Sequence, residues 1–216
     1  MTQQPQPGVG VGNPGAFGTD LPEDAADGAV TDPLGLLGAW LSAANTPVRP
    51  LGTLATIGAD GYPNARHLLA SLFDGERIHF HTDARSRKAA ELGADPRATL
   101  AFVWADVGRQ VIVTGDVVPV TEAERLAAFE GRSRYLQILA QVNDDGLAAQ
   151  PAATRRAVWS AYDGTHPTIE APPTWVGFAL TPRRIVFWRG DADGPSNRVI
   201  CVRGADGGWV STRHAG

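Results

Sequence analysis

Ser86, Arg87 and Lys88 place a hydroxyl and two adjacent cations at the start of a predicted helix. Ser86 is a favoured N-cap residue, so Arg87 and Lys88 fall in the first helical turn. The helix dipole is positive there, and each cation costs about 0.3–1 kcal/mol. Two interpretations are open: a solvated surface helix that tolerates this cost, or a turn that binds an anion.

Further polar residues interrupt or end apolar runs elsewhere in the chain. Arg66 begins the run "ARHLLAS", where an unpaired charge in a core would cost several kcal/mol. A phosphate would serve Arg66, Arg87 and Lys88 as a common partner, because guanidinium groups bind it bidentately and a helix N-terminus adds N–H donors. Other residues of this kind are Thr82, Gln110, Trp188 and Arg198.

The pattern of apolar residues and turn signals predicts an α+β fold. Strands with few intervening helices favour a mainly antiparallel sheet that closes into a barrel. Helices are predicted over 32–45, 86–93, 121–131, 133–142 and 153–164. Strands are predicted over 51–58, 65–73, 77–82, 97–104, 109–120, 174–181, 183–190, 197–203 and 208–212, with a hairpin at Asp60-Gly61.

Composition limits the class of protein. With 216 residues, 43% of them hydrophobic, the chain can bury one core, which we place in a domain over 31–216. Residues 1–30 are rich in Gly, Pro and Gln and are predicted to be a disordered tail. A net charge of −4 argues against a nucleic-acid partner. We find no signal peptide and no apolar run of about 18 residues, so we expect a cytoplasmic protein with no membrane segment.

The single cysteine and the histidines indicate neither a disulfide nor a metal site. Cys201 lies in a short apolar strand and is expected to be a buried thiol. His67, His79 and His81 alternate along strands, but no Cys or carboxylate stands at ligand spacing from them. We therefore predict no metal site.

Taken in order, several segments resemble the pyridoxamine 5′-phosphate oxidase family. They are "LATIGADGYPNARHLLAS", "FHTDARSRKAAELGADPRATLAFVW", "GRQVIVTGDV" and "IVFWRG", and the resemblance runs from about Asp32 to Thr212. It implies an FMN-binding split β-barrel with flanking helices that forms a homodimer, with the flavin at the subunit interface and a small molecule as substrate.

The resemblance carries the flavin contacts over position by position. The Ser86-Arg87-Lys88 turn would bind the FMN phosphate, and Gln110 would hydrogen-bond the isoalloxazine ring. A sheet-edge surface position for Gln110 and a core position for Trp188 remain alternatives. The full set of implied FMN contacts is Arg66, His67, Leu68, Leu69, Ser71, His81, Thr82, Ser86, Arg87, Lys88, Gln110, Trp188 and Arg198.

The substrate side departs from the family pattern. Ser71 stands where the family has a lysine that touches flavin and substrate, and Ala128 and Leu136 replace a tyrosine and a serine that hold the substrate phosphate. Only Arg132 of that group remains. The late R-L-H-D-R motif reads "GPSNR" here, and the R-L-A-P ending is replaced by "STRHAG". Each lost charged contact is worth roughly 1.5–3 kcal/mol, so the vitamin B6 site is expected to be lost.

Our leading hypothesis is an FMN-dependent oxidase or dehydrogenase of a small cyclic or aromatic, unphosphorylated metabolite in specialised metabolism. Phenazine-pathway oxidases are the branch of the family that shows similar drift. Ser71, His81 and Arg132 are candidates for positioning the substrate, although Arg132 also fits an exposed turn. The alternatives are a flavin or deazaflavin-dependent reductase, a non-catalytic flavin- or haem-binding protein, and a genuine pyridoxamine 5′-phosphate oxidase. The electron acceptor is left open.

Overall fold

The computed structural model describes residues 30–42, 50–191 and 194–216, so most of the predicted tail over 1–30 lies outside the described residues. The strands are β1 (Leu51–Ile57), β2 (Pro63–Phe73), β3 (Ile78–Asp83), β4 (Arg97–Trp104), β5 (Arg109–Pro119), β6 (Trp175–Arg189), β7 (Asn197–Arg203) and β8 (Trp209–Ala215). The helices are α1 (Pro33–Ser42), α2 (Arg87–Ala94), α3 (Glu122–Glu130), α4 (Arg134–Val142), α5 (Asp145–Ala148) and α6 (Ala152–Thr165), with a 3₁₀ turn at Ala105–Val107.

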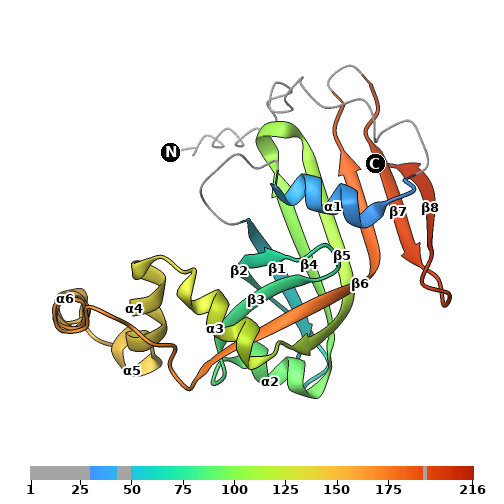
Figure 1. Cartoon of the computed structure of the whole chain (residues 1–216). Helices are drawn as coiled ribbons and strands as arrows, with labels where there is room; N and C mark the ends of the chain where they lie inside the picture. The colour runs from blue at the N-terminus through green and yellow to red at the C-terminus, as the bar shows by residue number, and fades with distance from the viewer. Residues whose placement is uncertain (1–29, 43–49, 192–193) are drawn as a thin grey trace, which may run out of the picture.

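All strand pairs are antiparallel, and the sheet closes on itself. Its order is β3-β2-β1-β4-β5-β6-β7-β8, and β3 also pairs with β6. Strands β3, β2, β1, β4, β5 and β6 therefore form a barrel, from which β7 and β8 extend the sheet beyond β6 (Figure 1). Gly61, with φ 82°, permits the tight β1–β2 turn. The predicted α+β antiparallel split barrel with flanking helices is confirmed.

Alternate side chains along the strands point into the barrel and form its core. Leu54 pairs with Leu100, Leu100 with Val113, and Val113 with Ile185, and all four are fully buried. This period-2 burial is the pattern expected of a sheet with one face on the core. Cys201 joins the same core, and burial raises the pKa of its thiol to about 11, as expected of a structural cysteine.

Helices close the two ends of the barrel (Figure 1). At one end α1 begins after Asp32, whose carboxylate accepts from the Gly35 N–H at 2.9 Å, and inserts Trp40 against Phe187 with ring centroids 5.2 Å apart. At the other end α2 buries Glu91 and Leu92. The end covered by α2 is the one that carries the cationic turn.

Strand β6 corrects one expectation. Two separate strands were predicted over 174–181 and 183–190 because Pro182 lies between them. One strand of 15 residues runs through this proline, at a register shift opposite Thr114 and Gly115. A bulge tolerates Pro because no ladder N–H is required there. A Cβ at Gly115 would overlap the Thr181 carbonyl oxygen, so glycine admits the close approach.

Helices α3 to α6 form an arm beside the barrel (Figure 1). The predicted capping box is present, because Thr121 Oγ1 accepts from the Glu124 N–H while Glu124 accepts from the Thr121 N–H at 2.7 Å. Helix α5 was not predicted; the Asp144 side chain caps it by accepting from the Leu147 N–H at 2.8 Å. Helix α6 buries none of its residues, and the side chain of Arg134 ties its last turn to α4.

A polar cluster ties the β2–β3 turn to the start of α3. His79 Nε2 lies 2.8 Å from Asp74 Oδ2, and Arg77 bridges Asp74 and Glu124 at 3.0 Å each. Burial acts to raise the pKa of the Asp74 carboxyl. Hydrogen bonds from His79, from the backbone N–H groups of Arg77 and Glu76, and from the Arg77 side chain outweigh it and lower the pKa well below 3.8. Ionised Asp74 therefore stabilises the fold.

Asp74→Asn should lower the free energy of unfolding by about 1–3 kcal/mol at pH 7, because it leaves His79 without its anionic partner and Arg77 with Glu124 alone. Because the lowered pKa stabilises fully above the unfolded value of 3.8 and this contribution is lost only as the pH falls below it, the difference from wild type should stay constant between pH 7 and 5 and shrink below pH 4. Urea denaturation at pH 7, 5 and 3 measures this. Glu76→Gln, in the same turn, should change stability by less than about 0.5 kcal/mol; an equal loss in both variants would contradict the prediction.

Candidate functional site

The turn between β3 and α2 contains one neutralised arginine. Arg85 Nε donates to Asp83 Oδ1 at 3.0 Å, and its Nη2 donates to Asp83 Oδ2 at 2.7 Å. These hydrogen bonds lower the pKa of Asp83, so the carboxylate stays ionised. Arg85 therefore already has an anionic partner. Of the other two cations at the turn, Arg87 lies 3.4 Å from Glu91, and Lys88 makes no ion pair among the described residues.

The N-terminus of α2 keeps donors available. The Ser86 side chain does not cap the helix; it lies 3.2 Å from Thr82 Oγ1 instead. Within the described residues, no hydrogen bond is made by the backbone N–H groups of Arg87 or Lys88. Lys88 Nζ donates to Thr82 Oγ1 at 2.9 Å. Hydroxyl, ammonium and free N–H groups thus converge on one turn, as in anion sites at helix N-termini.

The Lys88 ammonium is half-buried and has no carboxylate partner among the described residues. Desolvation, followed by the charge of Arg66, lowers its pKa below 10.5. A dianion at this turn would reverse both effects, because an opposite charge nearby favours the ammonium form. The donor set therefore fits a phosphate group.

Arg66 departs from the sequence expectation. It lies next to the turn, as predicted, but its partner within the protein is Glu91: Arg66 Nη2 lies 2.5 Å from Glu91 Oε2. Arg66 also donates to Thr56 Oγ1 at 2.5 Å. Arg66 is therefore not an unpaired charge in an apolar run, because α2 itself supplies a carboxylate, and its contact with a phosphate stays a prediction.

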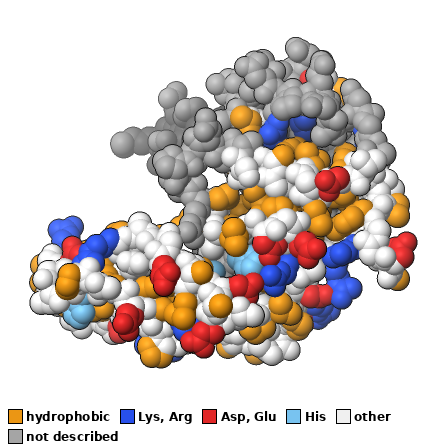
Figure 2. All heavy atoms as spheres, viewed as in Figure 1, with side chains coloured by type: hydrophobic (Ala, Val, Ile, Leu, Met, Phe, Trp, Pro, Cys, Tyr) orange, Lys and Arg blue, Asp and Glu red, His pale blue; other side chains and the backbone are white. Residues whose placement is uncertain are grey.

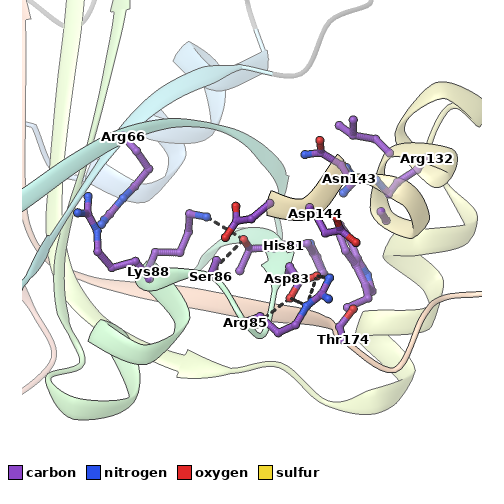
Figure 3. A pocket seen from close by; sticks show the side chains of 17 residues that line it. Arg66, His81, Asp83, Arg85, Ser86, Lys88, Arg132, Asn143, Asp144 and Thr174 are labelled. Carbon is purple, nitrogen blue, oxygen red and sulfur yellow. Dashed lines mark hydrogen bonds and ion pairs between the residues drawn. The ribbon is translucent and has the colours of Figure 1, made fainter. Parts of the chain in front are cut away.

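A cavity of about 1010 Å³ opens beside the turn. Figure 3 shows Arg66, Lys88 and Ser86 on one side and Arg132, Asn143 and Asp144, from the helical arm, on the other. Drug-sized ligands occupy pockets of roughly 300–1,000 Å³, so an extended mononucleotide fits. The predicted contacts that line the cavity are Arg66, His81, Thr82, Ser86, Arg87, Lys88 and Arg132.

A stacked group of side chains forms part of the cavity wall. The rings of His81 and Trp175 are nearly parallel, with centroids 5.2 Å apart, and the Arg132 guanidinium lies 4.2 Å from the Trp175 ring centroid. His81 Nδ1 lies 2.9 Å from Ser71 Oγ. The predicted substrate residues Ser71, His81 and Arg132 are therefore linked through Trp175, which sequence reasoning missed because a tryptophan opening an apolar strand reads as core.

The remaining predicted contacts lie outside the cavity. Gln110, Trp188 and Arg198 pair across β5, β6 and β7, so their side chains share one face of the sheet. His67 and Leu69 are on β2, where they pair with Thr53 and Leu51, while Leu68 packs against the core. The structure thus divides the predicted flavin contacts of one chain into two groups.

The face of the molecule drawn in Figure 2 carries charges of both signs. Figure 2 shows acidic and basic side chains next to one another below hydrophobic side chains of the barrel. In the described residues no three His, Cys, Asp or Glu side chains are grouped so that they could hold a metal ion. No helix in the described part of the chain has the length and apolar character needed to cross a membrane.

Known proteins share this fold. A structure of PhzG from Burkholderia lata 383, in complex with tetrahydrophenazine-1-carboxylic acid, superposes with a TM-score of 0.79 at 26% identity, covering 93% of this chain and 100% of that one. An FMN-binding protein from Nostoc punctiforme, described as related to pyridoxamine 5′-phosphate oxidase, gives a TM-score of 0.67 at 19% identity, covering 84% and 96%. The latter likeness concerns the fold alone.

Sequence relatives agree with the fold. The protein named pyridoxine/pyridoxamine 5′-phosphate oxidase of Caulobacter vibrioides is 37% identical over 187 residues, or 84% of each chain. The protein of the same name from Myxococcus xanthus is 39% identical over 163 residues, 72% of this chain and 76% of that one. The family model described as pyridoxamine 5′-phosphate oxidase matches residues 44–189. The chain belongs to the pyridoxamine 5′-phosphate oxidase family, as its motifs indicated.

Proposed function

We propose that this protein is an FMN-dependent oxidoreductase that acts on a small cyclic or aromatic, unphosphorylated metabolite. The observation that carries the proposal is the β3–α2 turn, where half-buried Lys88 and uncapped N–H groups face a cavity. Membership of a family with flavin-binding members supports a flavin as the group that fills this cavity.

FMN fits the residues present. Lys88, Arg87, Ser86 and the first N–H groups of α2 would hold its phosphate, and Thr82 would orient Lys88 through their hydrogen bond. The bound flavin would supply hydride transfer, and the protein would orient the cofactor and the substrate.

The residues at the substrate positions of the family favour an unphosphorylated substrate. Ala128 and Leu136 stand where the resemblance implies a tyrosine and a serine and contribute no donor, and the Arg132 guanidinium lies over the Trp175 ring. A planar carboxylate needs only one such guanidinium, and Ser71 and His81 would add polar contacts beside it. The bound tetrahydrophenazine-1-carboxylic acid in PhzG, a cyclic carboxylate, supports this class.

Pyridoxamine 5′-phosphate oxidation is the second candidate. It is favoured by the names of the relatives at 37% and 39% identity. The side chains at 71, 128 and 136 count against it, because they leave Arg132 as the one cation of the predicted substrate-phosphate group. Loss of two charged contacts would weaken binding of a phosphorylated substrate at least about a hundredfold.

A second protomer would bring the two groups of flavin contacts together. Gln110, Trp188 and Arg198 share a sheet face with Val103, which is 62% exposed, and Ile112, on the same face of β5, is 40% exposed. Apolar residues at the surface around polar groups are typical of a protein interface. We propose a homodimer in which this face of one chain completes the cavity of the other.

The function is tested by purifying the native protein, identifying its cofactor by mass spectrometry, and following flavin bleaching anaerobically. We expect FMN, and bleaching by a dihydroaromatic carboxylate but not by pyridoxamine 5′-phosphate. Bleaching by pyridoxamine 5′-phosphate alone would establish the second candidate. A colourless protein that FMN does not reconstitute would refute both, and deazaflavin binding or turnover with NADPH would identify a reductase instead.

Arg87→Ala/Lys88→Ala should weaken FMN binding at least about a hundredfold, because two charged contacts of roughly 1.5–3 kcal/mol each are lost. Riboflavin, which has no phosphate, should bind equally to both proteins in fluorescence titrations. Arg85→Ala is the matched control, since Asp83 already neutralises that arginine, and its effect should stay below about threefold. Unchanged FMN affinity in the double variant would show that the phosphate does not bind at this turn.

The wild-type FMN affinity should fall as the pH rises toward 10.5, because the lowered pKa of Lys88 means that its positive charge is lost before that of an ordinary lysine. Titrations at pH 7, 8.5 and 9.5 measure this. The double variant lacks the ammonium and should show a flatter profile. Parallel profiles would exclude Lys88 as the titrating group.

Ile112→Asp should dissociate the proposed dimer and lower FMN affinity at least about tenfold, because it buries an unpaired charge in the interface. Light scattering after gel filtration and flavin absorbance measure the two effects. Tyr62→Asp, at the exposed β1–β2 turn, should leave both unchanged. A monomeric variant that retains FMN would show that one chain completes the site.

A further inference from the structure

A buried carboxylate lies directly behind the cationic turn. Glu91 is 7% exposed, and it accepts from Thr56 Oγ1 at 2.5 Å, from Asn64 Nδ2 at 2.8 Å and from Arg66 Nη2 at 2.5 Å. Arg87 Nε lies 3.4 Å from its other oxygen. Both carboxylate oxygens therefore have donors, and all the donors come from β1, β2 and the first turn of α2.

Glu91 is ionised throughout the working pH range. Burial acts to raise its pKa, but hydrogen bonds from Thr56 and Arg66, and the charges of Arg66 and Arg87, outweigh burial and lower the pKa. A phosphate site would gain attraction without this carboxylate, since like charges repel across a protein interior with little screening. Its position therefore calls for an explanation beyond anion binding alone.

Two effects of Glu91 follow from the geometry. It holds the Arg66 guanidinium at the end of the barrel, where Thr56 Oγ1 and the Leu54 carbonyl also accept from Arg66. It also lowers the positive charge at the start of α2, where Arg66, Arg87 and Lys88 carry three positive charges and Glu91 one negative.

We infer that Glu91 is a positioning residue that fixes Arg66 and limits the affinity of the turn for the cofactor phosphate. This inference rests on the proposed function, since it assigns Glu91 a part in binding the same phosphate. A merely structural role would make Glu91 important for stability but indifferent to the charge of the ligand. The ratio of FMN to riboflavin affinity separates the two, because these ligands differ only in the phosphate.

The experiment titrates full-length apoprotein with FMN and with riboflavin in wild type and in Glu91→Gln. We expect the ratio of FMN to riboflavin affinity to rise about three- to tenfold in the variant, because one repulsive charge near the phosphate is removed. An unchanged or lower ratio would overturn the inference.

Two controls match the change in chemistry. Asp95→Asn alters the charge by the same amount at the far end of α2, next to exposed Arg97, and should move the ratio less than twofold. Asn64→Ala removes a hydrogen bond to Glu91 without changing its charge and should lower thermal stability while leaving the ratio in place. A rise in the ratio of similar size in either control would also overturn the inference.

Arg66→Met/Glu91→Gln covers the case in which the single variant does not fold, because removing both partners of a buried pair costs less than removing one. The excess charge of the site is then unchanged, and the ratio should stay within twofold of wild type. A tenfold lower ratio would show that Arg66 binds the phosphate and that Glu91 does not reduce this attraction, which would overturn the inference. If wild type binds neither flavin, the proposed function fails, which is distinct from an unchanged ratio.

Discussion

The ion pair between Arg66 and Glu91 ties the helix that carries the cationic turn to the strand opposite it. Because both groups are largely buried, each requires the other, and loss of one partner would leave an uncompensated charge. The pair fixes how α2 lies across the end of the barrel. The direction of the first N–H groups of α2, and the reach of Lys88 to Thr82, both depend on that placement.

Closure of the barrel through β6 fixes the positions of the other residues discussed for the site. The first half of β6 pairs with β3 and begins with Trp175, while the second half pairs with β7 and carries Trp188. One strand therefore contributes to the cavity and to the outer sheet face. The register shift at Thr114/Gly115 lets it turn between these two environments without losing its pairing with β5.

Local chemistry in the sequence predicted the barrel, the helix starts and the cationic turn, because alternation and capping act over a few residues. Contacts between distant residues were beyond it. The pattern showed Arg66 in an apolar run but not that Glu91, 25 residues later, would meet it. Likewise it gave no sign that Trp175 would stack on His81 and Arg132. The predicted strand boundary at Pro182 was wrong because a bulge cancels the usual penalty for proline.

The predicted flavin contacts also show the limit of reading residues from a resemblance. The motif order placed Gln110 and Lys88 in one list, yet the register of β5 and β6 puts Gln110 on the outer sheet face and α2 puts Lys88 at the cavity. Position in a motif identifies the residue, whereas the topology determines on which surface of the protein the residue lies. The residues named by the resemblance therefore lie on different surfaces of a single chain.

The two sides of the cavity differ in how firmly they are built. The turn rests on a closed ladder of strands, whereas the opposite side rests on a helical arm whose outermost helix fully buries none of its residues and packs through the partly buried Trp159 and Tyr162. Segments with few buried apolar groups open at low free-energy cost while the core stays closed. The cavity thus has one stiff wall and one compliant wall, so local opening of the arm would widen the cavity without displacing its barrel side.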